Sequence, residues 1–178
     1  MTPLSSPVTY SKNATMTFSD EIKIIVVDDH QIFIEGVKKV LNEMTDLNCQ
    51  VVGEAANGND LLRLMRKTEA DLLFLDMNLP DMDGLEVLEA LRKNPIKPIK
   101  IIILTMYDDP KIVKSAFKSR VDGYVLKGNG VEELKNAIRE VMKGNTFMGK
   151  GVSLTNGIGK SKMVTQNYHA AFQDRFIK

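Results

Sequence analysis

Hydrophobic and polar positions follow two alternating patterns between residues 22 and 144. Short, nearly continuous runs of Val, Ile and Leu give way to longer segments in which apolar residues recur every three or four positions. The first pattern predicts strands at 22–29, 49–55, 71–77, 99–105 and 122–127. The second predicts helices at 31–44, 58–68, 83–93, 108–120 and 131–144. The sequence therefore predicts five consecutive strand–helix units.

This alternation predicts an α/β fold. The strands at 22–29, 71–77 and 99–105 are apolar on both sides, as expected when helices cover both faces of a parallel sheet. Right-handed crossovers and short connections favour a doubly wound sheet. For five strands the expected order is 2-1-3-4-5, which is the flavodoxin-like (CheY-like) arrangement.

Several residues mark helix ends in the sequence. Asp83 with Glu86 three positions later has the capping-box spacing, and Asp109 before Pro110 indicates another helix start. Gly144 is expected to end the last helix. Asp81 is interpreted as a solvated turn residue. In the first helix, the residues expected to face the core are Ile32, Val37, Val40, Leu41 and Met44.

The two ends of the chain lack this regular pattern. Residues 1–20 are rich in Ser and Thr and lack the basic start and apolar run of a signal peptide, so we expect a disordered leader. Residues 21–148 are expected to form the folded domain. Residues 149–178 are expected to be a Gly-, Lys- and Ser-rich linker and a tail, in which Tyr168, Phe172 and Phe176 have helical spacing.

Composition narrows the function classes. The net charge of +1 gives no overall basic field to attract nucleic acid. The single cysteine, Cys49, allows no internal disulfide and suits a small buried position. No apolar run approaches the length of about 18 residues that a membrane span needs. These features favour a cytoplasmic protein with no membrane partner.

Ionisable residues follow the predicted strands. Asp28 and Asp29 end the first strand, Asp76 the third, Thr105 the fourth and Lys127 the fifth. In a doubly wound sheet, function lies at the carboxyl ends of the strands, beside the switch point between strands 1 and 3. We therefore expect three carboxylates, one hydroxyl and one ammonium to converge on one edge of the sheet.

Such a cluster has a specific chemistry. Three close carboxylates raise one another's pKa unless a cation joins them, and hard oxygen ligands suit Mg²⁺. A carboxylate held beside Mg²⁺ and a lysine is well placed to attack a phosphoryl group and become an aspartyl phosphate. The metal and the ammonium would neutralise the transferring oxygens, and a threonine hydroxyl could bond the product.

Four separated motifs, "VVDDHQ", "LFLDMNLPDMDG", "IIILTMYDD" and "GYVLKG", resemble the receiver domain of two-component response regulators. The stretches "DDHQIFIEGV" and "GYVLKGNGVEEL" most resemble the NarL/FixJ-type subfamily. The resemblance covers roughly residues 22–148. It implies a sensor histidine kinase as phosphoryl donor and Asp76 as phosphoacceptor. It also implies dimerisation on phosphorylation.

The resemblance implies further roles at the same edge. Asp29 and Asp76 would hold Mg²⁺ with the backbone carbonyl of Asn78, and Asp28 would assist, often through water. Thr105 and Lys127 would contact the phosphoryl group. Tyr124 occupies the switch-aromatic position, from which the family remodels the face of its fourth helix, fifth strand and fifth helix.

Some positions leave alternatives open. Gly128 stands where many receivers have proline, so the isomer of the Lys127–Gly128 bond is open from sequence. His30 could be a metal ligand or phosphate relay, although the start of a helix is the simpler interpretation. A calcium loop is excluded, because Leu79 and Ala90 would fall at ligand positions.

The output also has alternatives. NarL/FixJ-type regulators usually continue into a helix-turn-helix domain, for which too little chain follows the last helix. The first hypothesis is therefore the receiver portion of a transcription regulator that binds DNA through an absent C-terminal domain. The second is a stand-alone receiver acting by protein–protein contact. A haloacid-dehalogenase-type phosphatase is the enzyme alternative, although that family needs Asp where Asn78 stands.

Overall fold

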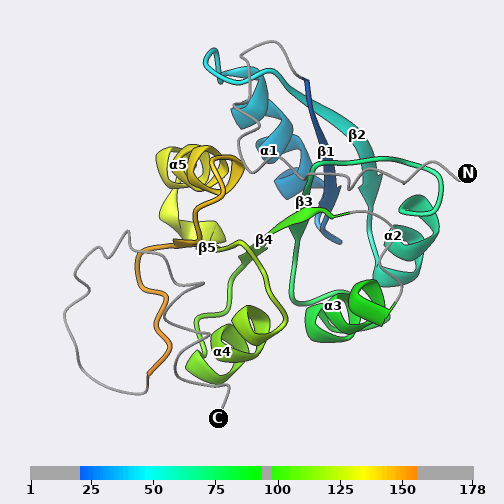
Figure 1. Cartoon of the computed structure of the whole chain (residues 1–178), viewed down its shortest axis with the longest axis vertical. Coiled ribbons are helices and arrows are strands. Elements are labelled where there is room, and N and C mark those ends of the chain that lie inside the picture. Colours follow the sequence, from blue (N-terminus) through cyan, green and yellow to red (C-terminus); the bar gives the residue numbers. More distant parts are fainter. Residues whose placement is uncertain (1–20, 94–97, 156–178) are drawn as a thin grey trace, which may run out of the picture.

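A computed structural model describes residues 21–93 and 98–155 of the chain. Its centre is a parallel sheet in the order β2-β1-β3-β4-β5-β6 (Figure 1). The order of the first five strands confirms the predicted doubly wound, flavodoxin-like arrangement. The strand bounds are β1 Ile22–Val27, β2 Cys49–Ala55, β3 Leu72–Leu75, β4 Lys100–Thr105, β5 Gly123–Leu126 and β6 Phe147–Met148.

Helices cover both faces of the sheet. Helices α1 and α5 lie on one face, and α2, α3 and α4 lie on the other (Figure 1). A single turn of 3-10 helix, η1, joins β5 to α5. The helix bounds are α1 Gln31–Asn42, α2 Gly58–Leu64, α3 Gly84–Lys93, α4 Pro110–Lys118, η1 Lys127–Asn129 and α5 Val131–Met142.

The strand β3 shows why the apolar runs are continuous. Leu72 and Phe74 pack into the core under α1 and α5, while Leu73 and Leu75 pack into the core on the opposite face. Successive side chains of a strand point to opposite faces, and here both faces are covered. Each buried Leu or Phe side chain contributes about 1.5–3 kcal/mol of transfer free energy, so this strand is central to stability.

Two features differ from the predictions. The sheet has a sixth strand, β6, which pairs with β5 and was not expected because two residues are too few to show a periodic pattern. The prediction that Ile32 faces the core is wrong, since Ile32 is 79% exposed. The helix α1 begins at Gln31, and its buried stripe starts at Ile34 and continues through Val37 and Leu41.

The predicted helix caps are present. Glu86 donates its N–H to Asp83 Oδ1 (2.9 Å), and Asp83 donates its N–H to Glu86 Oε2 (2.9 Å). Asp109 accepts the N–H of Lys111 and precedes Pro110 at the first turn of α4. Gly144 follows α5 with φ of +90°. These local signals set where the helices begin and end.

Asp81 has a more specific role than the predicted solvated turn residue. Its carboxylate accepts N–H groups from Gly58 (2.8 Å) and Asn59 (2.9 Å) in the first turn of α2. The hydrogen bond from Asn59 is the main cause that lowers the pKa of Asp81 below its ordinary value. Asp81 therefore fastens the β3–α3 loop to α2.

Some sequence predictions concern other parts of the chain. The leader 1–20 and the tail with Tyr168, Phe172 and Phe176 lie outside the described residues. Within the described ranges no peptide bond is cis, so the Lys127–Gly128 bond is trans. No helix in the described part of the chain has both the length and the apolar character needed to cross a membrane.

Candidate functional site

Three charged side chains from three different strands meet at the carboxyl edge of the sheet. Asp28 follows β1, Asp76 follows β3 and Lys127 follows β5. The ammonium nitrogen of Lys127 lies 2.6 Å from Asp28 Oδ2 and 2.7 Å from Asp76 Oδ2. All three side chains are at most 5% exposed. The convergence expected from the topology is therefore present for two of the carboxylates and the ammonium.

The sheet itself fixes the two aspartates. The N–H of Asp76 donates to the carbonyl of Val27 (3.0 Å), and the N–H of Asp28 donates to the carbonyl of Ala55 (3.1 Å). These bonds continue the parallel pairing of the strands by one residue. The two carboxylates are thus held by rigid backbone, as a site that must keep its geometry requires.

The loop after Asp76 folds tightly back over it. The backbone pairing of Asn78 with Asp83 closes this loop, and Gly84 then lies directly against its start. A Cβ atom at Gly84 would stand 2.8 Å from the Cα atom of Met77 and 3.0 Å from the carbonyl oxygen of Asp76. This close approach explains why the motif "DMDG" ends in glycine.

The negative charge of the cluster exceeds its positive charge. Asp28 and Asp76 share the single ammonium of Lys127, and the half-buried Asp29 adds a third carboxylate. One candidate ligand atom from each of Asp28, Asp29, His30 and Asp76 lies within 4.8 Å of the others. Clustered carboxylate oxygens fit a hard divalent cation such as Mg²⁺.

Thr105 and Tyr124 occupy the neighbouring strands and are fully buried. Thr105 pairs in register with Leu126, the residue before Lys127. The N–H of Tyr107 lies 3.4 Å from Thr105 Oγ1, and the hydroxyl of Tyr124 donates to the carbonyl of Tyr107 (2.8 Å). Burial raises the pKa of Tyr124, so its hydroxyl stays a donor. Both side chains therefore contact the start of the β4–α4 loop.

Comparison with known proteins identifies this arrangement. The family model for the response regulator receiver domain matches residues 24–139. The chain belongs to the response regulator receiver family. The match spans the ends of the four strands, β1, β3, β4 and β5, that carry the site residues, so the receiver fold and the acidic edge belong to the same unit.

Several relatives are regulators of this kind. The response regulator GacA of Pseudomonas aeruginosa is 34% identical over 128 residues, which are 71% of this chain and 58% of GacA. The nitrate/nitrite response regulator protein NarL of Escherichia coli is 31% identical over 138 residues, which are 78% of this chain and 62% of NarL. The chain thus spans about three fifths of the length of these relatives.

Solved structures show the same fold. The isolated receiver domain of RcsB from Salmonella enterica serovar Typhimurium, determined in the presence of the phosphomimetic BeF₃⁻, has a TM-score of 0.68 and 28% identity. The match covers 75% of this chain and 96% of that domain. A structure of RcsB dimers bound to DNA has the same TM-score, with 27% identity, and the match covers 75% of this chain and 66% of the RcsB chain.

Two ring side chains at the start of α1, Phe33 in the helix and His30 before it, also lie at the receiver site. The ring of Phe33 lies 4.3 Å from the ammonium nitrogen of Lys127, a cation–π distance that sequence reasoning did not anticipate. His30 precedes α1 and places Nδ1 2.7 Å from Asp29 Oδ1, with its ring edge-on to Phe33. The interpretation of His30 as a helix start holds, although the imidazole also contacts the acidic cluster.

Asn78 is the remaining predicted site residue. Its N–H lies 3.3 Å from Asp76 Oδ1, so its backbone lies beside the carboxylates. The role of its carbonyl as a metal ligand stays a prediction. Cys49 lies on the edge strand β2, and no contact described here joins it to the site residues. Burial raises the pKa of its thiol to about 11.

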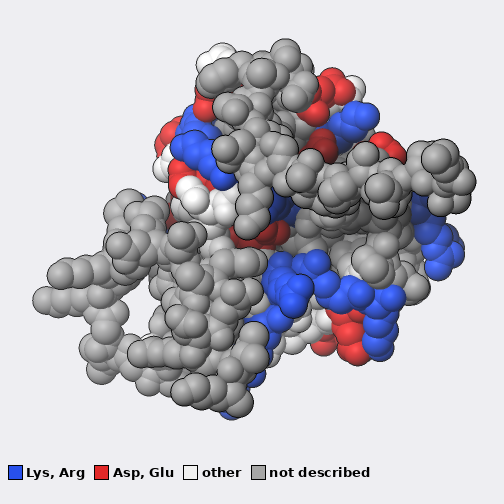
Figure 2. All heavy atoms as spheres, viewed as in Figure 1, with Lys and Arg blue, Asp and Glu red and all other residues white. Residues whose placement is uncertain are grey.

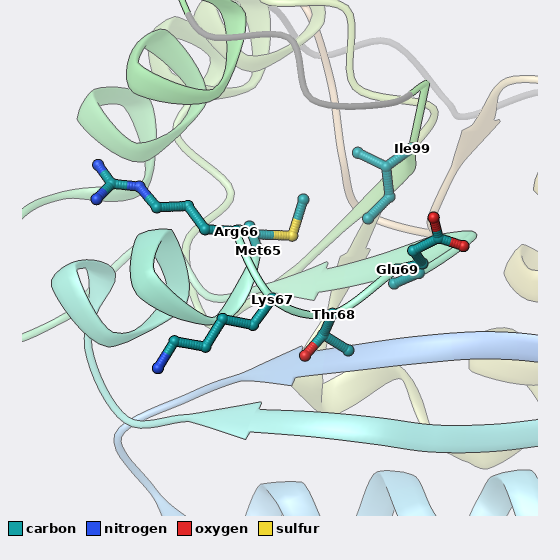
Figure 3. A pocket seen from close by; sticks show the side chains of 7 residues that line it. Met65, Arg66, Lys67, Thr68, Glu69 and Ile99 are labelled. Atoms are coloured by element: carbon teal, nitrogen blue, oxygen red, sulfur yellow. The ribbon is translucent and has the colours of Figure 1, made fainter.

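The rest of the described surface gives weaker candidates for a functional site. A hollow of about 380 Å³ lies at the opposite, amino edge of the sheet, where Arg66 and Lys67 extend to one side and Glu69 to the other (Figure 3). Basic and acidic side chains are interspersed over the face shown in Figure 2. The buried acids beside Lys127 therefore remain the candidate site of this receiver.

Proposed function

We propose that Asp76 accepts a phosphoryl group from a sensor histidine kinase. The observation that carries this proposal is the buried contact of Asp76 with Lys127 at 2.7 Å, beside two further aspartates. A buried carboxylate that contacts a cation is held in one orientation, beside the charge that neutralises the transferring phosphoryl oxygens, as a nucleophile for this step must be. The family of the chain supports the same conclusion.

The transfer is a simple displacement at phosphorus. A carboxylate oxygen of Asp76 forms a bond to phosphorus while the bond to the donor's leaving atom breaks, and the leaving atom keeps that electron pair. Lys127 neutralises negative charge on the phosphoryl oxygens. Thr105 bonds the phosphoryl group afterwards. The protein thus assists its own phosphorylation and dephosphorylation without being an enzyme for other substrates.

The carboxylates fit Mg²⁺ as the cofactor. Asp29, Asp76 and the backbone carbonyl of Asn78 would hold the ion, and Asp28 would assist. When bound, Mg²⁺ would offset the repulsion between the carboxylates and neutralise charge on the phosphoryl oxygens. The excess of carboxylates over cations described above is the feature of this chain that supports its binding.

The response to phosphorylation would pass through Thr105 and Tyr124. Both already contact Tyr107 in the β4–α4 loop. A Thr105 hydroxyl drawn to the phosphoryl group would release the N–H of Tyr107 and change the packing of Tyr124. The face formed by α4, β5 and α5 would then rearrange and favour a homodimer.

The output that we propose is control of transcription. Relatives of this chain include the transcriptional regulatory protein DegU of Brevibacillus brevis, 29% identical over 130 residues. DNA binding would belong to a C-terminal domain outside residues 21–155, and the site of action would be the cytoplasm. A receiver that acts by protein–protein contact alone is the second candidate. The family match argues against the phosphatase alternative.

The test is intact mass after incubation with acetyl phosphate and Mg²⁺. We expect one phosphoryl increment in the parent chain and none in Asp76→Asn or after removal of Mg²⁺. Asp83→Asn is the matched control, because it changes a neighbouring acid that only caps α3, and it should still gain the increment. A parent chain that neither gains the increment nor binds BeF₃⁻ while remaining folded would overturn the proposal.

A further inference from the structure

The chain returns to the sheet after α5 and contacts the edge strand β5. Phe147 and Met148 pair with Gly123 and Tyr124, and the N–H of Gly149 donates to the carbonyl of Tyr124 (2.8 Å). Val152 is buried in the core that includes Tyr124. This segment is therefore packed structure, and it leads directly to residue 155 and the rest of the chain.

A buried glutamate fastens this segment to the loop after β5. Glu133, in the first turn of α5, is only 8% exposed. Its Oε1 atom accepts the side-chain N–H of Asn129 (2.5 Å) and the backbone N–H of Lys150 (2.8 Å). Asn129 also donates to the carbonyl of Lys150 (2.8 Å). Three hydrogen bonds thus join η1, α5 and the segment after β6.

Gly149 packs closely against both Glu133 and the strand β5. A Cβ atom at Gly149 would stand 2.5 Å from Glu133 Oε1 and 3.1 Å from the carbonyl oxygen of Tyr124. Gly149 can therefore lie between the glutamate and the strand only because it lacks a side chain. We refer to Asn129, Glu133, Gly149 and Lys150 as the latch.

The latch begins two residues after Lys127, which contacts the proposed phosphoacceptor Asp76. Lys127 and Asn129 are the first and last residues of η1, a single 3-10 turn. At one end of this turn Lys127 contacts Asp76, and at the other Asn129 contacts Glu133 and Lys150. A phosphoryl group on Asp76 would place its own oxygens between the carboxylate and the ammonium, so Lys127 would have to move.

We propose that this movement opens the latch, so that phosphorylation of Asp76 loosens β6 and the segment to residue 155. The inference rests on the proposed function. The latch bonds are 2.5–2.8 Å long, so a shift of η1 lengthens them at once. Glu133 is then a positioning residue that couples Lys127 to the segment leading to any output. By linkage, opening the latch also favours the occupied site.

The experiment is amide hydrogen exchange by NMR on the full 178-residue chain with Mg²⁺, with and without BeF₃⁻. BeF₃⁻ is the probe because it binds without hydrolysis, and chemical-shift changes at Thr105 report its binding. We expect exchange at Gly149 and Lys150 to become at least about tenfold faster with BeF₃⁻, a coupling of the usual size. Exchange in β1 should not change.

Variants separate coupling from packing. Glu133→Ala should speed exchange at Lys150 without BeF₃⁻, abolish the further increase and tighten BeF₃⁻ binding severalfold. Glu133→Gln keeps an acceptor oxygen and should restore most of the coupling. Glu132→Ala is the matched control, because Glu132 precedes Glu133 in the same helical turn but is 79% exposed, and it should behave as the parent.

The outcomes are distinct. If BeF₃⁻ binds while exchange at Gly149 and Lys150 stays the same or slows, the latch proposal is overturned and the phosphoacceptor function stands. If BeF₃⁻ does not bind and acetyl phosphate adds no increment, the proposed function is overturned and the latch proposal falls with it. The comparison of amide exchange in the parent chain with and without BeF₃⁻ needs no variant. It therefore still tests the latch proposal if Glu133→Ala fails to fold.

Discussion

The two edges of the sheet both carry aspartates, but they use them differently. At the amino edge, Asp71 accepts the N–H of Lys23 (2.8 Å). Asp122 accepts the N–H of Ile101 (2.9 Å) and the ammonium of Lys100 (2.8 Å). Each of these carboxylates has a backbone donor of its own, so its role is to join neighbouring strand ends.

At the carboxyl edge the carboxylates also accept backbone N–H groups, from His30 to Asp28 (2.9 Å) and from Asn78 to Asp76 (3.3 Å), but they outnumber the lysine cations beside them. Asp28 and Asp76 are almost fully buried and share Lys127, and Asp29 lies beside them. Burying two carboxylates on one shared cation costs folding free energy, and a protein retains such a group where chemistry needs it. The comparison teaches that deep burial and a shared cation, more than the number of acidic residues, distinguish the functional edge from the structural one.

The largest expected effect comes from removing the shared cation. Lys127→Met leaves Asp28 and Asp76 buried together, so we expect a loss of about 3–5 kcal/mol in the free energy of unfolding. Mg²⁺ should raise the melting temperature of this variant more than that of the parent, because the ion replaces the missing charge. Urea and thermal unfolding with and without Mg²⁺ measure both effects. An equal response to Mg²⁺ in the two chains would contradict the charge imbalance.

A smaller effect is expected at the amino edge. Asp122→Ala removes the acceptor of the Ile101 N–H and the partner of the half-exposed Lys100, at a cost of about 1–3 kcal/mol in the free energy of unfolding. Phosphoryl incorporation from acetyl phosphate should match that of the parent. Loss of incorporation in a folded Asp122→Ala chain would show that the two edges are not independent.

The smallest effect concerns Asp81, a carboxylate with backbone donors near the functional edge. Its pKa is lowered in the fold, so the stability it contributes is present above its ordinary pKa near 3.8 and is lost as the pH falls through the folded pKa. Asp81→Ala should therefore have a lower urea midpoint than the parent at pH 7, and the gap should narrow below about pH 4. A gap that stays constant to pH 3 would contradict this account.

The fold was largely predictable because its signals are local and repeated. Continuous apolar runs such as 99–105 mark strands buried on both faces, and the spacing of Asp83 and Glu86 marks a helix start. The strand β6 was not predictable, since two residues form a strand only when β5 offers them an edge. Ile32 was misplaced although the start of α1 was predicted correctly, because it lies off the buried stripe of the helix, which starts at Ile34.

The residues of the site also divide into those that the sequence predicted and those that it did not. The topology alone brings Asp28, Asp76 and Lys127 to one edge, so their contact followed from the order of the strands. Phe33 and Glu133 could not be found from sequence. The ring centroid of Phe33 lies 4.3 Å from the ammonium nitrogen of Lys127. Glu133 accepts the backbone N–H of Lys150, in the segment that follows α5 and β6. Both depend on tertiary distances that no spacing rule encodes.

The sixth strand has a consequence for the behaviour of the chain in a crowded solution. An uncovered strand edge presents unpaired N–H and carbonyl groups that can template pairing with another molecule. Here β6 pairs with Gly123 and Tyr124, the first half of β5, and because β6 has only two residues the edge that it presents is very short. A receiver that released β6 completely would expose β5 to self-association. Self-association through β5 would thus limit how far this segment could open if phosphorylation loosens it as proposed.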